Sequence, residues 1–287
     1  MKWADFSKLV KLRLTFLVVF SASISFLIGS KVNGHIVWEN WVKLIIGGFL
    51  VTAAANCFNE IIEKDLDRLM RRTMDRPIPA GRMTTGQALV LGLFMGISGT
   101  YLLGSLNYLT GLLSVFSIIL YAFAYTPLKR KSPIAVFVGA IPGALPPLIG
   151  YIAAHERIDS IAVILFCIQF VWQFPHFWAI AWVLDDDYKL AGFRLLPSGK
   201  RNLTSAIITF IFTLLLVPVS LLPTFYHFGG YYVGTVSLVC SLVFLGLAFT
   251  LLRRLNIDAA KKLMYGSFFY LPVVQLMFLF DFIGKAK

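Results

Sequence analysis

Residues 41–58 read WVKLIIGGFLVTAAANCF, and residues 59–68 continue as NEIIEKDLDR. As a helix, the first part would be about long enough to span the hydrocarbon core of a bilayer, and it holds one charged residue, Lys43. Lipid offers the backbone no hydrogen-bond partners, so an apolar run of this length must be helical. The stretch therefore predicts a membrane-spanning helix that continues into an acidic segment at the membrane surface.

The same apolar pattern extends over the chain. Of the 287 residues, 58% are apolar and 14% are charged, which excludes a disordered chain and leaves too little polar surface for a soluble domain. The three cysteines are scattered through apolar segments, so there is no disulfide framework. We predict an all-α polytopic membrane protein, a single domain over 1–287, with nine transmembrane helices. The expected spans are 14–30, 41–58, 87–105, 108–126, 134–154, 161–182, 204–223, 230–252 and 263–284.

The positive charges that give the net charge of +12 are unequally divided between the two sides of the membrane. If the spans alternate, 21 of the 26 lysines and arginines fall on the side of the N-terminus and five fall on the other side. This is the positive-inside pattern, and it places the N-terminus in the cytoplasm and the C-terminus outside. Short basic clusters between apolar runs also exclude nucleic acid as a partner.

An acidic stripe follows the second span. Asn59, Glu63 and Asp67 stand four residues apart, so a helix would place them on one face. An amide and two carboxylates are hard oxygen ligands of the kind that Mg²⁺ uses together with substrate phosphate. A solvated, salt-bridged helix end explains the same spacing. Asp65 points away from the stripe and is expected to pair with an arginine or lysine.

Basic residues continue the same spacing. Arg68, Arg72 and Arg76 follow at steps of four, as if on the same helix, and are suited to contact phosphate oxygens. Pro77 and Pro79 are then expected to end the helix.

These motifs resemble those of the UbiA superfamily of intramembrane prenyltransferases. The resemblance starts with NxxxExxxD and the following Pro-Ile-Pro-Ala-Gly turn. Further stretches are similar to the branch of the family that farnesylates haem. They are RRTMDRP at 71–77, YTPLKR at 125–130, GAIPGALPPLIG at 139–150, PHFWA at 175–179 and DYKLAG at 187–192.

The resemblance implies a nine-helix UbiA-like bundle in a bacterial cell (inner) membrane, with Mg²⁺ as cofactor. It implies transfer of the farnesyl group of farnesyl diphosphate to the vinyl group of haem B, which gives haem O and releases diphosphate. Haem B is here a substrate and not a permanent cofactor. The lipid bilayer and a haem A synthase or terminal oxidase assembly are the other implied partners.

A second acidic segment, LDDDYK at 184–189, lies in the other long cytoplasmic loop. The family's second motif is usually DxxxD, and aligning Asp187 with its last position puts Val183 at the first, so the pair is not intact. Whether Asp185 or Asp186 replaces the missing partner stays open. The expected metal ligands are Asn59, Glu63, Asp67 and Asp187. The expected substrate-binding residues are Arg72, Arg76, Tyr125, Lys129, Arg130 and Lys189.

His176 lies within an apolar and aromatic span. An ionisable residue inside a membrane usually faces a cavity and is functional, and imidazole also binds iron. We expect His176 to contact haem or to transfer a proton near the vinyl group. A structural hydrogen bond to a backbone carbonyl is the alternative.

Three other functions remain open. A UbiA-type enzyme with a quinone-precursor aromatic acceptor would share the acidic stripe, although PHFWA and DYKLAG favour haem. A transporter of an anionic solute would carry its charges near the membrane midplane, whereas these cluster at one face. An oxidase assembly factor without catalysis would need no aligned stripe.

Overall fold

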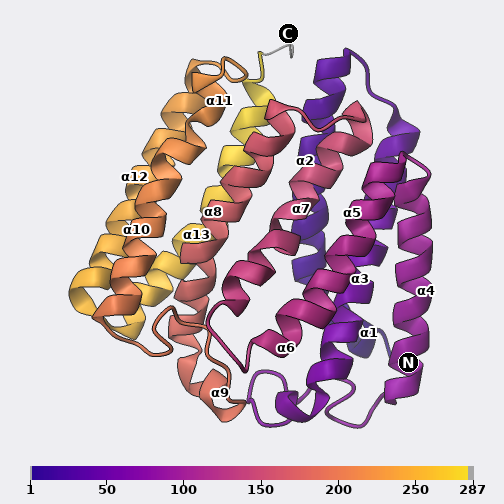
Figure 1. Ribbon diagram of the computed structural model, residues 1–287, viewed down its shortest axis with the longest axis vertical. Coiled ribbons are helices and arrows are strands. Elements are labelled where there is room, and N and C mark those ends of the chain that lie inside the picture. Colours follow the sequence, from indigo (N-terminus) through magenta and orange to yellow (C-terminus); the bar gives the residue numbers. More distant parts are fainter. Residues whose placement is uncertain (1, 284–287) are drawn as a thin grey trace.

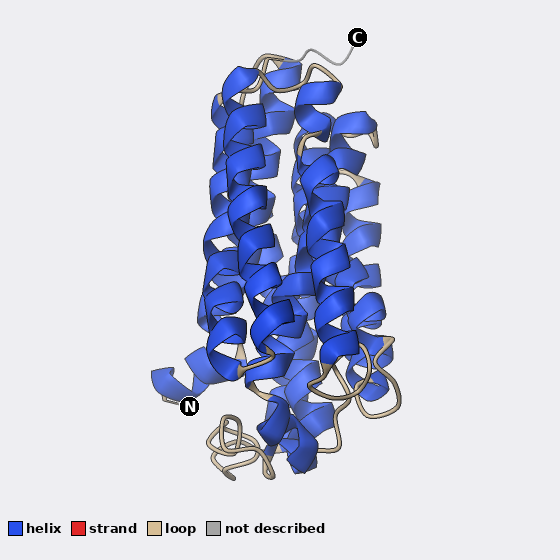
Figure 2. Cartoon of the chain, turned by 90° about the vertical axis from the view of Figure 1, so that its left-hand side faces the viewer, coloured by secondary structure: helices blue, strands red, loops and turns tan. Residues whose placement is uncertain are grey.

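The computed structural model describes residues 2–283, and Figure 2 draws them as long helices joined by loops, the more extended of which lie at its lower end. A π-helical segment, η1, interrupts the fourth span. The elements are α1 (Trp3–Leu9), α2 (Leu12–Asn33), α3 (Trp38–Asp67), α4 (Thr85–Gly104), α5 (Tyr108–Ile119), η1 (Leu120–Tyr125), α6 (Thr126–Leu128), α7 (Ala135–His155), α8 (Ser160–Val183), α9 (Asp185–Leu190), α10 (Leu203–Ser220), α11 (Leu222–Phe225), α12 (Tyr231–Arg254) and α13 (Ile257–Phe280).

Within residues 2–283, nine helical segments are long and apolar enough to cross a membrane, which confirms the predicted number. They lie side by side as one bundle (Figure 1). The last span begins at Ile257 rather than at 263, because Asn256 accepts the backbone N–H of Ala259 and caps the helix there. Its predicted end at 284 lies outside the described residues.

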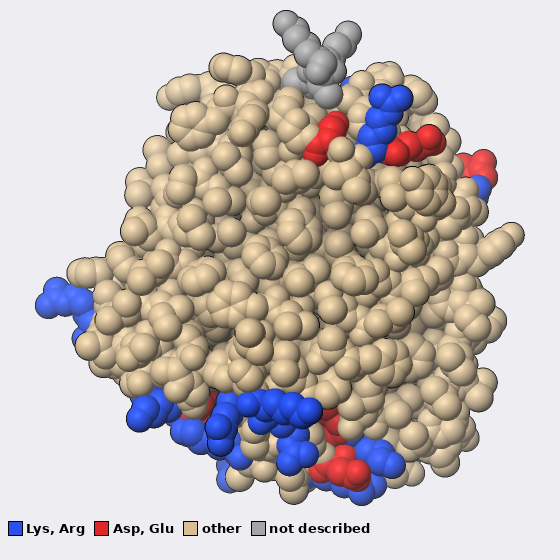
Figure 3. Space-filling model, in the orientation of Figure 1, with Lys and Arg blue, Asp and Glu red and all other residues tan. Residues whose placement is uncertain are grey.

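The two ends of the bundle differ. The short helices α1, α6 and α9 and the long connection 68–84 lie at one end, and α11 lies at the other (Figure 1). Figure 3 shows lysine and arginine gathered at the first end, below a wide band of uncharged surface. We call this end the charged end.

The outer and the central helices differ in how exposed their large apolar side chains are. The outer helices α4 and α12 expose large apolar side chains, such as Phe94 (65%) and Val243 (61%), as expected of a surface solvated by lipid. The central helices α7 and α8 bury theirs, including Tyr151 and Trp178. The centre of the bundle is therefore where a protected site can form.

The π-helix η1 was not predicted. Its hydrogen bonds reach one residue further than those of an α-helix, so it adds a residue to the turn before α6. It carries Tyr121 and Tyr125, whose ring centroids are 5.4 Å apart, towards the interior. The segment that follows it provides Thr126 and Lys129.

Candidate active site

The predicted acidic stripe lies at the inner edge of the charged end. Asn59, Glu63 and Asp67 all belong to α3 and are buried, with exposed fractions of 1%, 4% and 0%. Asn59 Nδ2 donates to Glu63 Oε2 at 2.8 Å and to Thr126 Oγ1 at 3.0 Å. The stripe is thus tied to the end of η1 rather than to solvent, which argues against the solvated helix end.

A cation meets each member of the stripe. Lys129 Nζ lies 2.9 Å from Glu63 Oε1. Arg76 Nη1 lies 2.6 Å from Asp67 Oδ2. The third cation, Lys11, donates to Asn59 Oδ1 at 2.8 Å. These cations come from three separate segments of the chain, so the site exists only in the folded bundle.

The positive charge of Lys11 is disfavoured by its surroundings. Burial lowers the pKa of its ammonium well below the usual range, and the nearby Arg76 and Lys129 lower it further, whereas Glu63 and Asp67 raise it. Its acceptor, Asn59, is neutral, so no carboxylate is hydrogen-bonded to Lys11. An incoming polyanion such as a diphosphate would supply the missing negative charge.

The stripe fits a hard divalent cation. Asp67 Oδ1 is buried without a hydrogen-bond partner in the part of the chain that the structure describes. An unpaired buried carboxylate oxygen is costly unless a cation reaches it. No group of three or more His, Cys, Asp or Glu side chains within residues 2–283 forms a metal site by itself. A metal held here would therefore rely on Asn59 and on substrate oxygens besides the carboxylates.

The prediction that the helix continues through Arg76 is wrong. Helix α3 ends at Asp67, because Thr73 Oγ1 donates to the Asp67 carbonyl at 2.9 Å and the chain turns. Buried Glu60 then accepts the backbone N–H of Ile78 at 3.2 Å. Side chains thus take over the backbone hydrogen bonds that further helical turns would have made.

The three arginines consequently do not share a face. Arg68 pairs with Asp65 at 3.2 Å, which confirms the pairing expected for Asp65. Arg76 folds back on Asp67, and the Arg72 side chain is exposed. Arg76 is therefore part of the buried site, whereas Arg72 lies at its solvent side.

The hydrogen bonds of Asp187 go to the connection 68–84 and not to the stripe. From α9, Asp187 accepts the backbone N–H of Arg71 at 2.9 Å and that of Arg72 at 3.5 Å. It thereby fastens the connection 68–84 to the second acidic segment. Its role as a metal ligand stays a prediction.

The neighbours of Asp187 pair among themselves. Lys189 lies 2.6 Å from Asp185, and Arg201 lies 3.0 Å from Asp186. Lys189 is 56% exposed, and Arg130 is also exposed at the same end. The structure does not bring either of them to the stripe.

A cavity of about 410 Å³ lies next to the stripe, a size typical of ligand pockets. Its wall near the charged end includes Asn56, Tyr125 and His176, and its deep end includes Leu44 and Gln275. Helices α2, α3, α7, α8 and α13 and the π-helix η1 all contribute to it. The wall is largely apolar, so it suits a greasy substrate.

The wall is open to the side between α2 and α13. These helices touch where Gln275 Nε2 of α13 donates to Ser21 Oγ, near the middle of α2, at 2.8 Å. Nearer the charged end, Leu14, Leu17 and Phe268 line the cavity although they are 46%, 58% and 45% exposed. The cavity therefore communicates with the lipid there.

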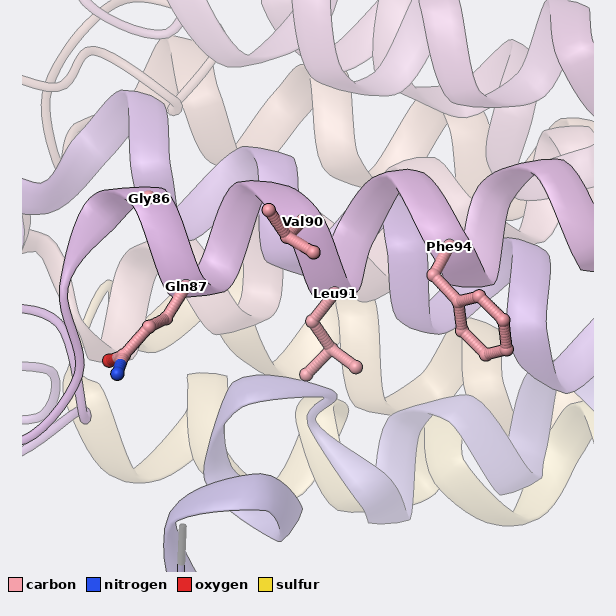
Figure 4. Close-up of a pocket in the computed structure, with 5 residues that line it drawn as sticks. All are labelled: Gly86, Gln87, Val90, Leu91 and Phe94. Carbon is pink, nitrogen blue, oxygen red and sulfur yellow. The ribbon is translucent and has the colours of Figure 1, made fainter.

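A second hollow carries no site. Figure 4 shows it on α4, lined by Gly86, Gln87, Val90, Leu91 and Phe94. All five residues belong to one outer helix, and no charged group is among them. We interpret it as a groove filled by lipid.

Tyr125 links the stripe to the cavity. The Lys129 ammonium lies 4.7 Å from the centroid of its ring, a cation–π contact. The ring packs so closely on α7 that a Cβ atom at Gly139 would come within 2.6 Å of it. Glycine is thus needed at this position to hold Tyr125 and, through it, Lys129.

His176 faces the cavity from α8 with a defined tautomer. Ser267 Oγ donates its proton to the Met264 carbonyl at 2.5 Å, so it accepts one from His176 Nδ1 at 2.7 Å. Nε2 is then the unprotonated nitrogen. The ring stacks on Trp172 with centroids 4.5 Å apart, which fixes its direction. The partner of Nδ1 is a hydroxyl and not the backbone carbonyl of the structural alternative.

Sequence reasoning missed three residues of the site: Lys11, Glu60 and Thr126. Lys11 is one of four basic residues near the N-terminus, and no motif distinguishes it from Lys2, Lys8 and Arg13. Its backbone is left-handed (φ 48°), just before α2 begins at Leu12. Glu60 and Thr126 belong to motifs quoted above, but no spacing rule connects Glu60 with Ile78 or Thr126 with Asn59.

The geometry can be compared with known proteins. Residues 18–273 match the UbiA prenyltransferase family, and the chain belongs to that family. It is 45% identical to the protoheme IX farnesyltransferase of Cytophaga hutchinsonii, with 96% of each chain covered. It is 33% identical to the mitochondrial protoheme IX farnesyltransferase of Arabidopsis thaliana, over 93% of this chain and 62% of that protein.

Solved structures agree on the fold. A digeranylgeranylglyceryl phosphate synthase structure matches with a TM-score of 0.81 at 20% identity, over 97% of each chain. A UbiA homolog from Archaeoglobus fulgidus bound to GPP and Mg²⁺ matches with a TM-score of 0.62 at 14% identity, over 96% of this chain and 99% of that one. The predicted UbiA-like fold is confirmed, and the transporter and assembly-factor alternatives are not favoured.

Proposed function

We propose that this membrane prenyltransferase transfers the farnesyl group of farnesyl diphosphate to the vinyl group of haem B. In particular, we propose the activity of a protohaem IX farnesyltransferase, which forms haem O and releases diphosphate. The observation that carries the proposal is the buried Asn59–Glu63–Asp67 stripe with its three cations, beside a greasy cavity. The named relatives support haem B as the acceptor.

Mg²⁺ is the proposed cofactor. Asn59, Glu63 and the unpartnered Asp67 Oδ1 would hold it, with Asp187 as a further ligand if α9 contributes. When bound, the metal supplies a Lewis acid that stabilises negative charge on the diphosphate. The oxygen donor set and the adjacent cations support this assignment.

The basic residues bind and neutralise the leaving group. As the allylic C–O bond breaks, its electron pair goes to the diphosphate, and Lys11, Arg76 and Lys129 lie where that charge grows. Arg72, Arg130 and Lys189 are exposed at the same end, outside the stripe, and their contact with the diphosphate stays a prediction. The Tyr125 ring faces the allylic carbon and stabilises its positive charge.

The acceptor half of the reaction takes place in the cavity. The vinyl group's π electrons form the new C–C bond to the farnesyl carbon, which leaves a cation on the vinyl carbon next to the ring. Water adds to that carbon, and the unprotonated Nε2 of His176 takes the proton that the water loses. A cavity walled by lipid and apolar side chains limits premature capture of the cation by water.

The surroundings of the enzyme are also proposed. We place the charged end in the cytoplasm of a bacterial cell, with the protein integral to the inner membrane. The whole chain 1–287 acts as one domain. A haem A synthase or a terminal oxidase assembly receives the product.

One assay tests the function. Purified protein is incubated with haem B, farnesyl diphosphate and Mg²⁺, and haem O is detected by its mass. The proposal predicts product that is abolished by combined Glu63→Ala and Asp67→Ala and lowered by His176→Ala. Absence of haem O from the wild type would overturn the function. Replacing haem B by 4-hydroxybenzoate tests for the quinone-precursor acceptor.

A further inference from the structure

Three polar side chains line the deep end of the cavity, beside apolar side chains such as Leu44 and Ile149. Ser21 of α2, Gln169 of α8 and Gln275 of α13 are at most 5% exposed and line it together, and we call them the polar floor. Ser21 Oγ donates to Gln169 Oε1 at 2.8 Å. Gln275 Nε2 donates to Ser21 Oγ at 2.8 Å and to Gln169 Oε1 at 3.0 Å.

The floor is also anchored to α7, for a reason that the sequence provides. Pro147 has no amide hydrogen, so the carbonyl of Gly143, one turn earlier, loses its helical partner. Gln169 Nε2 donates to that carbonyl at 2.7 Å. Gln169 is therefore fixed from both sides, and the floor joins α2, α7, α8 and α13.

The distance from the floor to the stripe matches a prenyl chain. Lys11 marks the diphosphate end, and Ser21 follows ten residues later, which is about 15 Å along a helix axis. Between them the cavity is lined by apolar side chains such as Leu17 and Leu271. This span is comparable with an extended chain of three isoprene units.

We infer that the polar floor sets the upper length of the prenyl chain. The inference rests on the proposed function and adds the part of the site that selects a fifteen-carbon donor over a twenty-carbon one. A longer chain that keeps to the cavity, rather than bending out through the side opening between α2 and α13, has to push a floor side chain aside. Its hydrogen-bonding groups would then be unpaired at membrane depth, where neither water nor lipid can replace the partners.

The test compares prenyl donors in variants of the floor. In Gln275→Ala, we expect kcat/KM for geranylgeranyl diphosphate relative to farnesyl diphosphate to rise at least tenfold. In Ser21→Met, a longer side chain raises the floor, and the preference for geranyl over farnesyl diphosphate rises at least tenfold. Ser21→Ala, which removes a single oxygen, serves if Gln275→Ala does not fold.

A second polar network provides the matched control. Ser241 bonds to Ser220 and to Tyr270, both at 2.9 Å, among α10, α12 and α13 and away from the cavity. Ser241→Ala removes two buried hydrogen bonds of the same kind and should leave the donor ratios unchanged. If the folded floor variants keep the wild-type ratios, the floor is only a structural joint and the inference is overturned.

Binding separates this inference from the proposed function. Equilibrium binding of radiolabelled farnesyl and geranylgeranyl diphosphate, with Mg²⁺ and without haem, needs no acceptor. Equal binding of the two by wild type would overturn the inference even if haem O forms. A preference for farnesyl diphosphate that Gln275→Ala removes, with no haem O formed, would support the floor and overturn the acceptor.

Discussion

Glu63 accepts hydrogen bonds from Asn59 and from Lys129, so its charge is engaged before any substrate binds. In Glu63→Gln we expect turnover of farnesyl diphosphate to fall about 10²- to 10³-fold, as when one preorganised electrostatic group is removed from an active site. Steady-state kinetics in nanodiscs measure this. Glu39→Gln breaks an exposed pair with Lys43 and should leave the rate unchanged. Equal losses in both variants would contradict a specific role.

Lys11 is expected to bind the donor rather than the acceptor. Lys11→Met should raise KM for farnesyl diphosphate about tenfold, which corresponds to about 1.4 kcal/mol, and leave KM for haem B unchanged. Lys8→Met, which removes a nearby lysine paired with exposed Asp75, is the control. A rise in both KM values would mean that Lys11 only supports the fold.

Residues that share a helix face could be predicted, because the spacing of four is a local property. Asn59, Glu63 and Asp67 belong to this class. Lys11 and Thr126 could not be predicted, since they reach Asn59 from other helices. Such contacts depend on how the helices pack, and the spacing of residues along the sequence does not indicate them.

At the scale of elements, the packing of η1 against α7 depends on the close contact between the Tyr125 ring and Gly139. Gly139→Ala places a methyl group within 2.6 Å of the Tyr125 ring. We expect a loss of about 1–3 kcal/mol in unfolding free energy and lower activity, because the ring and Lys129 must shift. Gly246→Ala on α12 has open space around its Cβ and is the control in the same thermal denaturation assay. Equal stability of the two variants would contradict the packing argument.

The attachment of α1 should depend on pH. Hydrogen bonds from Lys8 and Arg82 lower the pKa of Asp75, and Arg82 also lies 2.7 Å from Asp5 of α1. The stabilisation is complete above the unfolded-state pKa of about 3.9 and is lost as pH falls through the lower folded value. The protection factors of residues 3–9, which compare their hydrogen exchange with the intrinsic rate at each pH, should therefore fall below about pH 4.

Asp75→Asn should show the same loss of protection in residues 3–9 already at neutral pH. Asp65→Asn, which affects only the local pair with Arg68, should not. If exchange of α1 is the same in both variants, Asp75 does not hold the helix.

Local pattern also failed at two elements. The spacing of the arginines continued the helix beyond Asp67, but Thr73 and Glu60 bind the backbone of the turn instead. The π-helix η1 likewise has an apolar sequence that suits an α-helix equally well. At the turn after Asp67, these hydrogen bonds outweigh a weak local preference.

For the whole molecule, the number of spans followed from the lengths of the apolar segments, because lipid leaves the backbone of such a segment no choice but a helix. The cavity could not be predicted, since apolar side chains that line a cavity and those that pack a core have the same periodicity. The polar floor combines side chains of three helices that are distant in sequence, so it could not be predicted either.

The proposed orientation can be tested with single cysteines. Lys131→Cys lies at the charged end and Arg157→Cys at the opposite end, and both positions are exposed. In intact cells, a membrane-impermeant thiol reagent should label position 157 but not 131. The native Cys57, Cys167 and Cys240 lie within spans and provide the unlabelled background. The reverse labelling would invert the topology.

The side opening between α2 and α13 has a kinetic consequence. Leu14, Leu17 and Phe268 leave the cavity in contact with lipid, so hydrophobic substrates reach it by diffusion in the plane of the membrane. The quantity that governs encounter is then the mole fraction of substrate among the lipids, rather than moles per litre of buffer. Adding inert lipid vesicles to a fixed amount of enzyme and substrate would slow the reaction by surface dilution.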